Sequence, residues 1–540
     1  MSESLNGRTT DRAVDRKAAV LRAAKALERF GRTGGRHDLL EHALAAGHDP
    51  DTHKAFFWAA LKAGDAKGAG DSLDALEKDS GFGIDEKDRQ WLQRARQALR
   101  NRRPVDTAAI IEKLRAPRQG PGIARGDRLC YLLNASLPQV ASGYAMRSQH
   151  LARAMQEAGA ALHCLTRPGF PGDRPGNESH DDALPSDEVD GVIYHRIPNP
   201  SRNEHKGGAY LEEAARALLA EFSRLRPKAV MAASNHVNAL PGLLAARGLG
   251  IPFIYEVRGF WELSRAARTP DYAHSPEYAA ELALESATAA HSDAVFTLSG
   301  PMRDELIARG VAEERIKLLP NACNPARHVP RSRDRELARH IGVPDGIPVI
   351  GYVGSFNDYE GLDDLVVACG ALRRRGREFR LLLVGGETVL YPGRAPVASQ
   401  LEQRAQAEGI GEWLVMPGLV PPEEVEAWYS LIDIAPFARK PLPVTELVSP
   451  MKPLEALSMA KAVVASDVAA QAEMIRHEET GLLFAKGDTA ALTGALERLL
   501  ADPTLRVRLG RNGRRWVLGA RSWSLVARRA LRWIEELTVN

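Results

Sequence analysis

The chain has 540 residues, of which 44% are hydrophobic and 26% charged. This composition is typical of a soluble globular protein, and the length predicts two or three domains instead of one core. The net charge is only +3, from 72 basic against 69 acidic residues, so no excess of positive charge points to nucleic acid as a partner. The four cysteines are scattered without metal-ligand spacing, which predicts reduced, buried thiols and a cytoplasmic protein.

The beginning of the sequence, MSESLNGRTTDR, is polar and lacks the apolar core of a signal peptide. No apolar run approaches the roughly 20 residues of a membrane-spanning helix. We therefore expect a cytoplasmic location, and peripheral contact with the inner face of the membrane stays open.

Residues 1–115 predict an all-helical region. Apolar residues recur at helical spacing over residues 20–27, and residues 39–50 predict a second short helix. Residues 55–77 predict two helices that are broken at Gly64. This hairpin of small residues resembles a tetratricopeptide-type (TPR-like) repeat, although the full repeat pattern is not met.

Two interpretations of this region stay open. It is either a helical array that recruits a protein partner or forms oligomers, or a helical cap on the domain that follows. Residues 116–127, rich in Pro, Gly and Arg, predict a linker. Because the donor-site motifs described below all follow this linker, we expect residues 1–115 to be dispensable for chemistry.

From residue 128 onward, short apolar runs alternate with helical segments, which predicts parallel α/β sheets built from βα units. The pattern breaks near residue 330 and then restarts. The predicted strands are 128–136, 160–166, 191–197, 229–234, 252–257 and 293–299 in the first unit, and 347–355, 379–386, 413–418, 431–437 and 462–466 in the second.

We therefore expect two Rossmann-like domains that face each other, over residues 128–335 and 345–520. An amphipathic helix is predicted over the remaining residues, 521–540. Ligands of such sheets bind at the carboxyl ends of the strands, so the cleft between the domains is the expected site.

Several stretches at predicted strand ends carry chemistry. Gly143 opens the helix after the first strand, where a glycine lets backbone N–H groups approach an anion. Arg439, Lys440 and Lys452 cluster after a later strand and beside a helix N-terminus, which together predict a diphosphate site. Glu455 is suited to accept hydrogen bonds from ribose hydroxyls.

Lys452 raises a question of its own, because it lies in the first turn of the helix predicted within residues 449–467. Ser449 followed by Pro450 suits a helix start, and a start at Pro453 is the alternative. In either case a cation lies at the positive end of the helix dipole, where acidic residues are favoured. A docked anion would explain the lysine, whereas a solvated surface lysine is the simpler interpretation.

Ordered motifs over residues 128–540 resemble those of the retaining GT-B glycosyltransferases of family 4. SDAVFTLSGPMRDELIARGV followed by IKLLPNACNP is similar to a strand and turn of that family. SPMKPLEALSMAKAVVASDVAAQAEMI with TGLLFAKGD resembles its donor-site signature. YEVRGFWE, GYVGSFNDYEGLDDL and RKPLPVTELVSPMKPLEA further resemble a bacterial exopolysaccharide-associated subgroup.

The resemblance implies an α/β GT-B fold whose C-terminal helix crosses back to the first domain. It implies a hexosyl-type glycosyltransferase of polysaccharide biosynthesis, which moves a sugar from a nucleoside-diphosphate sugar to a glycan or lipid-linked acceptor with retention of configuration. No metal or other cofactor is expected, because Arg and Lys side chains would stabilise the leaving phosphate. The alternatives are a catalytically weak GT-B scaffold that recruits partners through its helices, and another GT-B enzyme such as a nucleotide-sugar epimerase.

The strand-end motifs and the resemblance together define the candidate site. Arg258, Glu262 and Glu446 are the catalytic candidates, and His236 is an alternative near Arg258, which replaces a histidine common in the family. The candidates for donor binding are Gly143, Gly354, Ser355, Gly385, Gly418, Val420, Arg439, Lys440, Lys452, Leu454 and Glu455.

The sequence also departs from the family around the donor site. Ser355 and Glu360 stand where the family has Arg and Lys, on the loop after the first strand of the second domain. Glu446 is one position too far from Glu455 for the family's usual pair of glutamates. We therefore expect the positive charge to come from elsewhere, and Arg439 and the lysines near it are the substitutes.

Overall fold

In the computed structural model, the described residues are 24, 33–46, 50–63, 65–78, 86–101, 105–117, 122–174, 185–387, 396–421 and 423–539. The chain divides by its internal contacts into two compact units, which are described separately. The first comprises residues 1–110, 168–183 and 198–217, and the second comprises residues 111–167, 184–197 and 218–540.

Consecutive helices build the first unit. They are α2 (Thr33–Ala46), α3 (Pro50–Ala63), α4 (Ala66–Lys78) and α5 (Glu86–Arg100), and each packs against the next. Their buried core is formed by residues such as Leu40, Phe57 and Leu73. The helix break expected within residues 55–77 lies between α3 and α4. Most of the helix expected over residues 20–27 lies outside the described residues.

The first unit also takes chain from within the range expected for the first Rossmann-like domain. The N–H of Lys206 donates to the carbonyl of Asn101, which directly follows α5, at 2.5 Å. The hydroxyl of Tyr210 donates to the carbonyl of Pro168 at 2.9 Å. Helix α8 (Gly207–Leu225) then runs from the first unit into the second.

The first sheet of the second unit has eight strands in the order β3-β4-β2-β1-β5-β6-β7-β8, all parallel except β3, which pairs antiparallel with β4. The central strands are buried along their whole length, which explains their continuous apolar sequences. The strands are β1 (Leu129–Leu133), β2 (Leu162–Thr166), β3 (Ser186–Val189), β4 (Val192–His195), β5 (Ala229–Ala233), β6 (Phe253–Val257), β7 (Ala294–Thr297) and β8 (Ile316–Leu318).

Helices cover this sheet, and several begin at serine N-caps. The hydroxyl oxygens of Ser142, Ser275 and Ser299 each accept a hydrogen bond from an N–H group in the first turn of the helix that follows. Besides α8, the helices are α6 (Thr107–Arg115), α7 (Gly143–Glu157), α9 (His236–Leu249), α10 (Trp261–Ala266), α11 (Pro276–Ala290) and α12 (Gly300–Ala308).

The second sheet of this unit has six parallel strands in the order β11-β10-β9-β12-β13-β14. Its strands are β9 (Val349–Val353), β10 (Arg380–Val384), β11 (Leu414–Gly418), β12 (Ile434–Phe437), β13 (Ala462–Ser466) and β14 (Leu482–Phe484). The helices are α13 (Arg335–His340), α14 (Leu362–Arg374), α15 (Val397–Ala407), α16 (Val425–Leu431), α17 (Pro443–Leu447), α18 (Lys452–Ser458), α19 (Ala469–Ala472), α20 (Thr489–Ala501) and α21 (Pro503–Ala520).

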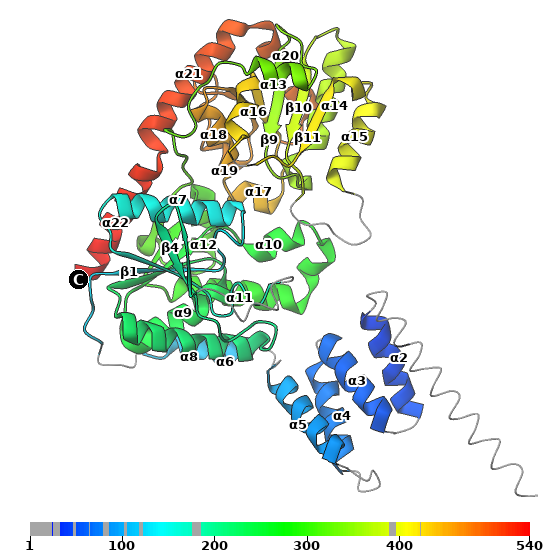
Figure 1. The fold of residues 1–540 in the computed structure, drawn as a ribbon, viewed down its shortest axis with the longest axis vertical. Coiled ribbons are helices and arrows are strands. Elements are labelled where there is room, and N and C mark those ends of the chain that lie inside the picture. The colour runs from blue at the N-terminus through cyan, green and yellow to red at the C-terminus, as the bar shows by residue number, and fades with distance from the viewer. Residues whose placement is uncertain are drawn as a thin grey trace, which may run out of the picture. The chain divides into compact units, whose positions relative to one another are not determined.

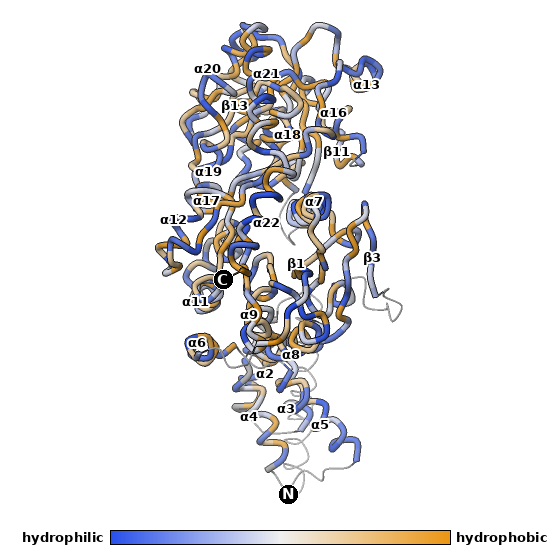
Figure 2. Tube along the Cα trace, turned by 90° about the vertical axis from the view of Figure 1, so that its left-hand side faces the viewer, coloured by the Kyte–Doolittle hydropathy of each residue, from blue (hydrophilic) through white to orange (hydrophobic). Residues whose placement is uncertain are grey.

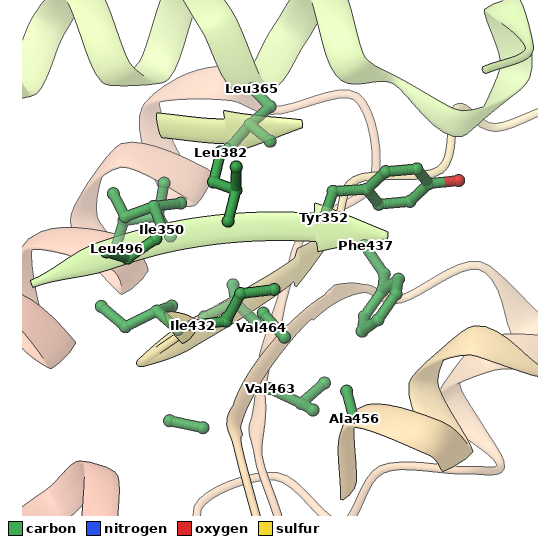
Figure 3. Packing of buried hydrophobic residues seen from close by; sticks show 14 of the residues in the cluster. Ile350, Tyr352, Leu365, Leu382, Ile432, Phe437, Ala456, Val463, Val464 and Leu496 are labelled. Carbon is green, nitrogen blue, oxygen red and sulfur yellow. The ribbon is translucent and has the colours of Figure 1, made fainter. Parts of the chain in front are cut away.

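The core of this domain lies between the sheet and its helices. Ile350 on β9, Leu382 on β10 and Val464 on β13 are fully buried. Figure 3 shows Tyr352 near the carboxyl end of β9, with its hydroxyl pointing away from the aliphatic side chains of the cluster. The outer helices are more hydrophilic than this core, and much of helix α13 is accordingly blue in Figure 2.

The last two helices connect the domains of the second unit (Figure 1). Helix α21 packs against α18 and β13 of the C-terminal domain. Helix α22 (Trp523–Val539) packs against α7, and its residues Trp523, Ala530 and Ile534 belong to the core of the N-terminal domain. Within the described ranges, the structure contains no helix with the length and apolar character needed to span a bilayer.

Candidate active site

Three glycines meet at the carboxyl ends of the neighbouring strands β9, β10 and β11. The N–H of Gly385 donates to the carbonyl of Gly418 at 2.9 Å. Gly354 and Gly385 have φ angles of 149° and 133°. A Cβ atom on Gly385 would collide with the carbonyl oxygen of Gly354, so a side chain is excluded there. These strand ends therefore expose bare backbone at the edge where parallel sheets bind ligands.

Lys452 reaches back from α18 over the end of β9. Its Nζ donates to the hydroxyl of Tyr352 and, at 3.3 Å, to the carbonyl of Ser355. A Cβ atom on Gly354 would collide with Cε of Lys452, so the glycine makes room for the lysine. Only 19% of the lysine side chain is exposed, and this burial lowers its pKa. Lys452 is therefore not a solvated surface lysine.

A buried carboxylate lies between Lys452 and Arg439. Oε1 of Glu360 is 3.6 Å from Nζ of Lys452, and Oε2 is 3.5 Å from Nε of Arg439. Burial by itself raises the pKa of Glu360, but the two cations outweigh it and hold the pKa below its ordinary value. Two of the three expected donor-site cations thus lie together, and Glu360 neutralises part of their charge.

The helix start at α18 differs from both expectations. The helix begins at Lys452 with Met451 as its N-cap, and Pro453 is its second residue. Ser449 is not the cap because its carbonyl and hydroxyl face Asn321 of the N-terminal domain.

Three consecutive carbonyls before this helix, at residues 447–449, each accept one side-chain hydrogen bond. From the N-terminal domain, Oγ of Ser299 donates to the carbonyl of Leu447 at 2.7 Å, and Nδ2 of Asn321 donates to the carbonyl of Ser449 at 2.8 Å. From the C-terminal domain, the guanidinium of Arg439 donates to the carbonyl of Val448 at 2.7 Å. The chain that delivers Lys452 to the site is therefore held by both domains.

Gly143 lies on the facing domain, at the first residue of α7. A Cβ atom on Gly143 would lie 3.7 Å from the terminal methyl of Met451. The start of α7 and the start of α18 therefore lie close together, as expected for strand-end loops of two facing domains.

Lys440 and Glu446 have other partners than the Lys452 group. Nζ of Lys440 lies 2.6 Å from the carboxylate of Asp363. One oxygen of Glu446 accepts from the N–H of Ala469 at 2.8 Å, and the other lies 2.6 Å from Nζ of Lys486. Both carboxylate oxygens of Glu446, a catalytic candidate, are thus occupied, because the residue stabilises the start of α19.

The remaining candidates of the C-terminal domain divide into two kinds. Glu455 is partly exposed in the first turn of α18 and accepts a long hydrogen bond, 3.4 Å, from the hydroxyl of Tyr429. Leu454 is fully buried in the core, and its N–H donates to the carbonyl of Met451 in the first turn of the helix. Val420 also packs against this core.

Arg258, a catalytic candidate, lies in a buried ion network of the N-terminal domain. Its guanidinium donates to Glu256 at 2.8 Å, to the hydroxyl of Ser148 at 2.8 Å and to the carbonyl of Tyr144 at 3.0 Å. Arg147 binds the other carboxylate oxygen of Glu256 at 2.9 Å. Burial raises the pKa of Glu256, but Arg258 and Arg147 overcome this and lower it to about 2. The structure therefore gives Arg258 a packing and charge-balancing position.

Glu262 and His236 are likewise engaged within the domain. The carboxylate of Glu262 is 2% exposed and pairs with Arg309 at 2.7 Å. The backbone N–H of His236 donates to Glu285 at 2.8 Å, and its ring Nδ1 lies 3.4 Å from the same carboxylate. Neither partner is close in sequence, which is why a motif comparison could not reveal these pairs.

Two residues near the site were not expected from the sequence. Tyr352 accepts a hydrogen bond from Lys452, and only the end position of Tyr352 on β9 could have indicated it. Glu473 binds the N–H of Gly300 with its two oxygens, at 3.0 and 3.2 Å, and so joins the two domains. The helix dipole stabilises an anion at the start of α12, but the sequence does not indicate which acidic residue lies there. No group of three or more His, Cys, Asp or Glu residues suited to a metal ion occurs in the part of the chain that the structure describes.

The sequence of residues 142–322 matches the family described as "Glycosyl transferase 4-like domain". Residues 334–516 match the family described as "Glycosyl transferases group 1". The chain carries both of these glycosyltransferase domains. The first covers α7 to β8, and the second covers the whole six-stranded sheet with Lys452 and Glu455.

Several proteins with assigned names are similar in sequence to this chain. The chain is 27% identical to the 2-deoxystreptamine glucosyltransferase of Streptomyces kanamyceticus, over 52% of this chain and 69% of the relative. It is 31% identical to the lipopolysaccharide core biosynthesis mannosyltransferase LpcC of Rhizobium leguminosarum bv. viciae, over 35% and 51%. The chain thus spans between half and about two thirds of the length of these relatives.

Solved structures show the same fold as the glycosyltransferase domains. The sucrose-phosphate synthase of Thermosynechococcus elongatus superposes with a TM-score of 0.61 at 20% identity, over 76% of this chain and 99% of that one. Anabaena HepE in complex with UDP superposes with a TM-score of 0.59 at 14% identity, over 76% and 100%. The fold is therefore GT-B, with two Rossmann-like parallel sheets.

Proposed function

We propose that the protein transfers a hexose from a nucleoside-diphosphate sugar to a glycan or lipid-linked acceptor, with retention of configuration, in polysaccharide biosynthesis. One observation carries this proposal. The group 1 domain buries Lys452 and Arg439 together beside the glycine-rich ends of β9, β10 and β11. Two cations beside exposed backbone suit the phosphates of a donor.

The donor site follows from this arrangement. The diphosphate binds Lys452 and Arg439 beside the glycine strand ends, where the absence of side chains leaves room for it. Glu455, in the first turn of α18, is partly exposed and accepts hydrogen bonds from ribose hydroxyls. The facing start of α7, with Gly143, closes the other side and limits access of water.

The chemistry that the site supports is dissociative transfer. The bond between the anomeric carbon and the phosphate oxygen lengthens, and negative charge develops on the leaving diphosphate. The fixed cations stabilise that charge, and the acceptor hydroxyl attacks from the same face and passes its proton to the leaving phosphate. Arg258, Glu262 and Glu446 are each paired with other residues in the structure, and this route assigns no proton transfer or attack to them.

The relatives are consistent with this class of donor. HepE is described in complex with UDP and with UDP-glucose, and LpcC is named a mannosyltransferase. We extend the donor class to this chain, together with a cytoplasmic location at the inner face of the membrane and a protein partner for the helical unit.

The proposal is tested with UDP-, GDP- and ADP-linked hexoses. A donor at a hundred times its dissociation constant should stabilise the protein by about 2.7 kcal/mol, which a thermal-shift screen detects. The donor found is then incubated with simple glycan acceptors, and NMR of the anomeric proton reports the configuration of the product. If no donor stabilises the protein, or if a bound donor is neither hydrolysed nor transferred, the scaffold alternative is favoured.

A further inference from the structure

The position of Glu360 is unusual for a site that must bind a diphosphate. Its side chain is 5% exposed, and it lies between the two cations that the proposed function assigns to the phosphates. The loop that carries it packs closely on the chain after β12, because a Cβ atom on the following Gly361 would collide with the carbonyl oxygen of Ala438. An anion is therefore built into the place where a ligand anion is expected.

The contacts of this carboxylate with the two cations are long. Its oxygens lie 3.6 Å from Lys452 and 3.5 Å from Arg439, whereas charge-assisted hydrogen bonds are about 2.7–2.9 Å. Oε2 of Glu360 and Nε of Arg439 have no hydrogen-bond partner among the described residues, although both are buried. Buried polar atoms are normally satisfied, so this pair retains bonding capacity for another group.

The charges lead to the same conclusion. Lys452 and Arg439 contribute two positive charges, and Glu360 removes one of them. A diphosphate that entered beside an unmoved Glu360 would meet a like charge at close range in a buried site, which is strongly unfavourable. A diphosphate that replaced Glu360 would meet both cations and could satisfy Nε of Arg439.

We propose that Glu360 is a resident counter-anion of the donor site, and that the diphosphate of the nucleotide sugar displaces it from Lys452 and Arg439. Glu360 thus holds the two cations in place while the site is empty, and it competes with the donor. This inference rests on the proposed function, because it needs a diphosphate ligand at these cations. It makes Glu360 a positioning residue that lowers donor affinity.

The test compares Glu360→Gln with Glu360→Asp in the full chain. Glutamine keeps the shape of the side chain without its charge, and aspartate keeps the charge on a shorter stem. Calorimetric titrations with UDP, GDP and ADP, and with the matching nucleosides, give the dissociation constants. We expect Glu360→Gln to bind the accepted diphosphate at least tenfold more tightly than the wild type, Glu360→Asp to show no such gain, and the nucleoside affinity to be unchanged.

A matched control removes the same charge elsewhere in the domain. Glu497 on α20 pairs with Arg375 and Arg377, which follow α14, whereas Glu360 precedes α14. Glu497→Gln should leave nucleotide affinity as in the wild type. Circular dichroism of each variant verifies that it is folded.

Three results would overturn the inference. They are equal or weaker diphosphate binding by Glu360→Gln, an equal gain in Glu360→Asp, or an equal gain for the nucleoside. If the wild type binds and uses a donor but Glu360→Gln shows no gain, only the inference fails. If neither protein binds any of the three diphosphates, the proposed function fails with it.

Discussion

At the scale of single residues, the partner of a side chain decides its function more than its type does. Lys452 and Arg258 are both largely buried cations at the ends of strands or helices. Arg258 makes short bonds to a fully buried glutamate, whereas Lys452 and Arg439 share Glu360 through long contacts. Short ion-paired hydrogen bonds of this kind stabilise a fold, whereas long ones leave both cations able to bind another anion.

Glu455 is the donor-site residue whose removal should affect binding without affecting the fold. It is partly exposed, and its carboxylate accepts a hydrogen bond of 3.4 Å from the hydroxyl of Tyr429. Glu455→Ala should raise the dissociation constant of the donor about tenfold or more, corresponding to the roughly 1.5–3 kcal/mol of a hydrogen bond to a charged group. Calorimetric titration measures this, and Glu402→Ala on α15 is the control. An unchanged constant would remove Glu455 from the site.

Glu256 should be a large contributor to stability. Glu256→Gln leaves Arg147 and Arg258 buried without their counter-charge, which should cost about 3–5 kcal/mol at pH 7. Chemical denaturation measures this loss. Glu157→Gln, at an exposed pair with Arg153, should cost no more than about 1 kcal/mol.

The same residue gives a pH dependence with a defined sign. The pKa of Glu256 in the folded protein is lowered to about 2 from an ordinary value near 4.5. Its contribution to stability is therefore complete above the ordinary pKa and is lost as the pH falls toward 2. The stability difference between the wild type and Glu256→Gln should shrink between pH 5 and pH 3. A difference that stays constant over this range would contradict the charged network.

At the scale of elements, the glycine strand ends and the segment before α18 together position Lys452. Gly354 leaves the space that Cε of Lys452 fills, and the carbonyls of residues 447–449 are held by Ser299, Asn321 and Arg439. Since two of these donors come from the N-terminal domain, the position of the lysine depends on how the domains meet.

Gly354→Ala tests this dependence. The new Cβ atom would displace the lysine side chain, and the φ angle of 149° is strained for a residue other than glycine. We expect a stability loss of about 1–3 kcal/mol and weaker nucleotide binding. Gly494→Ala on α20, where a Cβ atom meets nothing within 4 Å, should instead stabilise the protein by about 0.5–1 kcal/mol. Full nucleotide affinity in Gly354→Ala would mean that Lys452 does not contribute to binding.

At the scale of the whole molecule, the compact units do not follow the expected domain boundaries. Residues 168–183 and 198–217 belong with the helical unit, although they lie within the range expected for the first Rossmann-like domain. The helical unit therefore takes in chain beyond residue 115, and its two interpretations, a recruiting array and a cap, need an experiment to separate them.

A chain shortened to residues 126–540 separates the two interpretations. The charged donor-site residues all lie in the C-terminal domain, so nucleotide binding should persist within about threefold of the full chain. The two stretches that belong to the helical unit lose their partners, so the melting temperature should fall. A shortened chain with unchanged melting temperature and near-native transfer would instead support an independent recruiting region.

Metal independence is the second prediction at this scale. Lys452 and Arg439 are assigned to the charge of the leaving diphosphate, so transfer should continue in excess EDTA. The measurement is the transfer rate with and without the chelator. Complete loss of activity that magnesium or manganese restores would show that a metal ion shares this charge.

Much of the fold could be predicted locally. Strands such as β5 and β9 are buried on both faces of a parallel sheet, so they appear as continuous apolar runs. The sequence did not predict the strands β3, β8 and β14. They are short and lie at sheet edges, so too few buried apolar residues follow one another to form a recognisable strand pattern. The dipeptide Asp190-Gly191 is typical of a two-residue hairpin turn and could have predicted the β3–β4 hairpin. In the structure both residues have positive φ angles, as such a turn requires.

The sequence by itself determined the two Rossmann-like domains and singled out Lys452 as a candidate, because these depend on periodicity and on motifs within short stretches. Only the tertiary structure decided that Arg258, Glu262 and Glu446 are paired and that Glu360 lies between Lys452 and Arg439. The physical reason is that an ion pair between residues far apart in the chain depends on how strands and loops are brought together, and no local pattern encodes its partner.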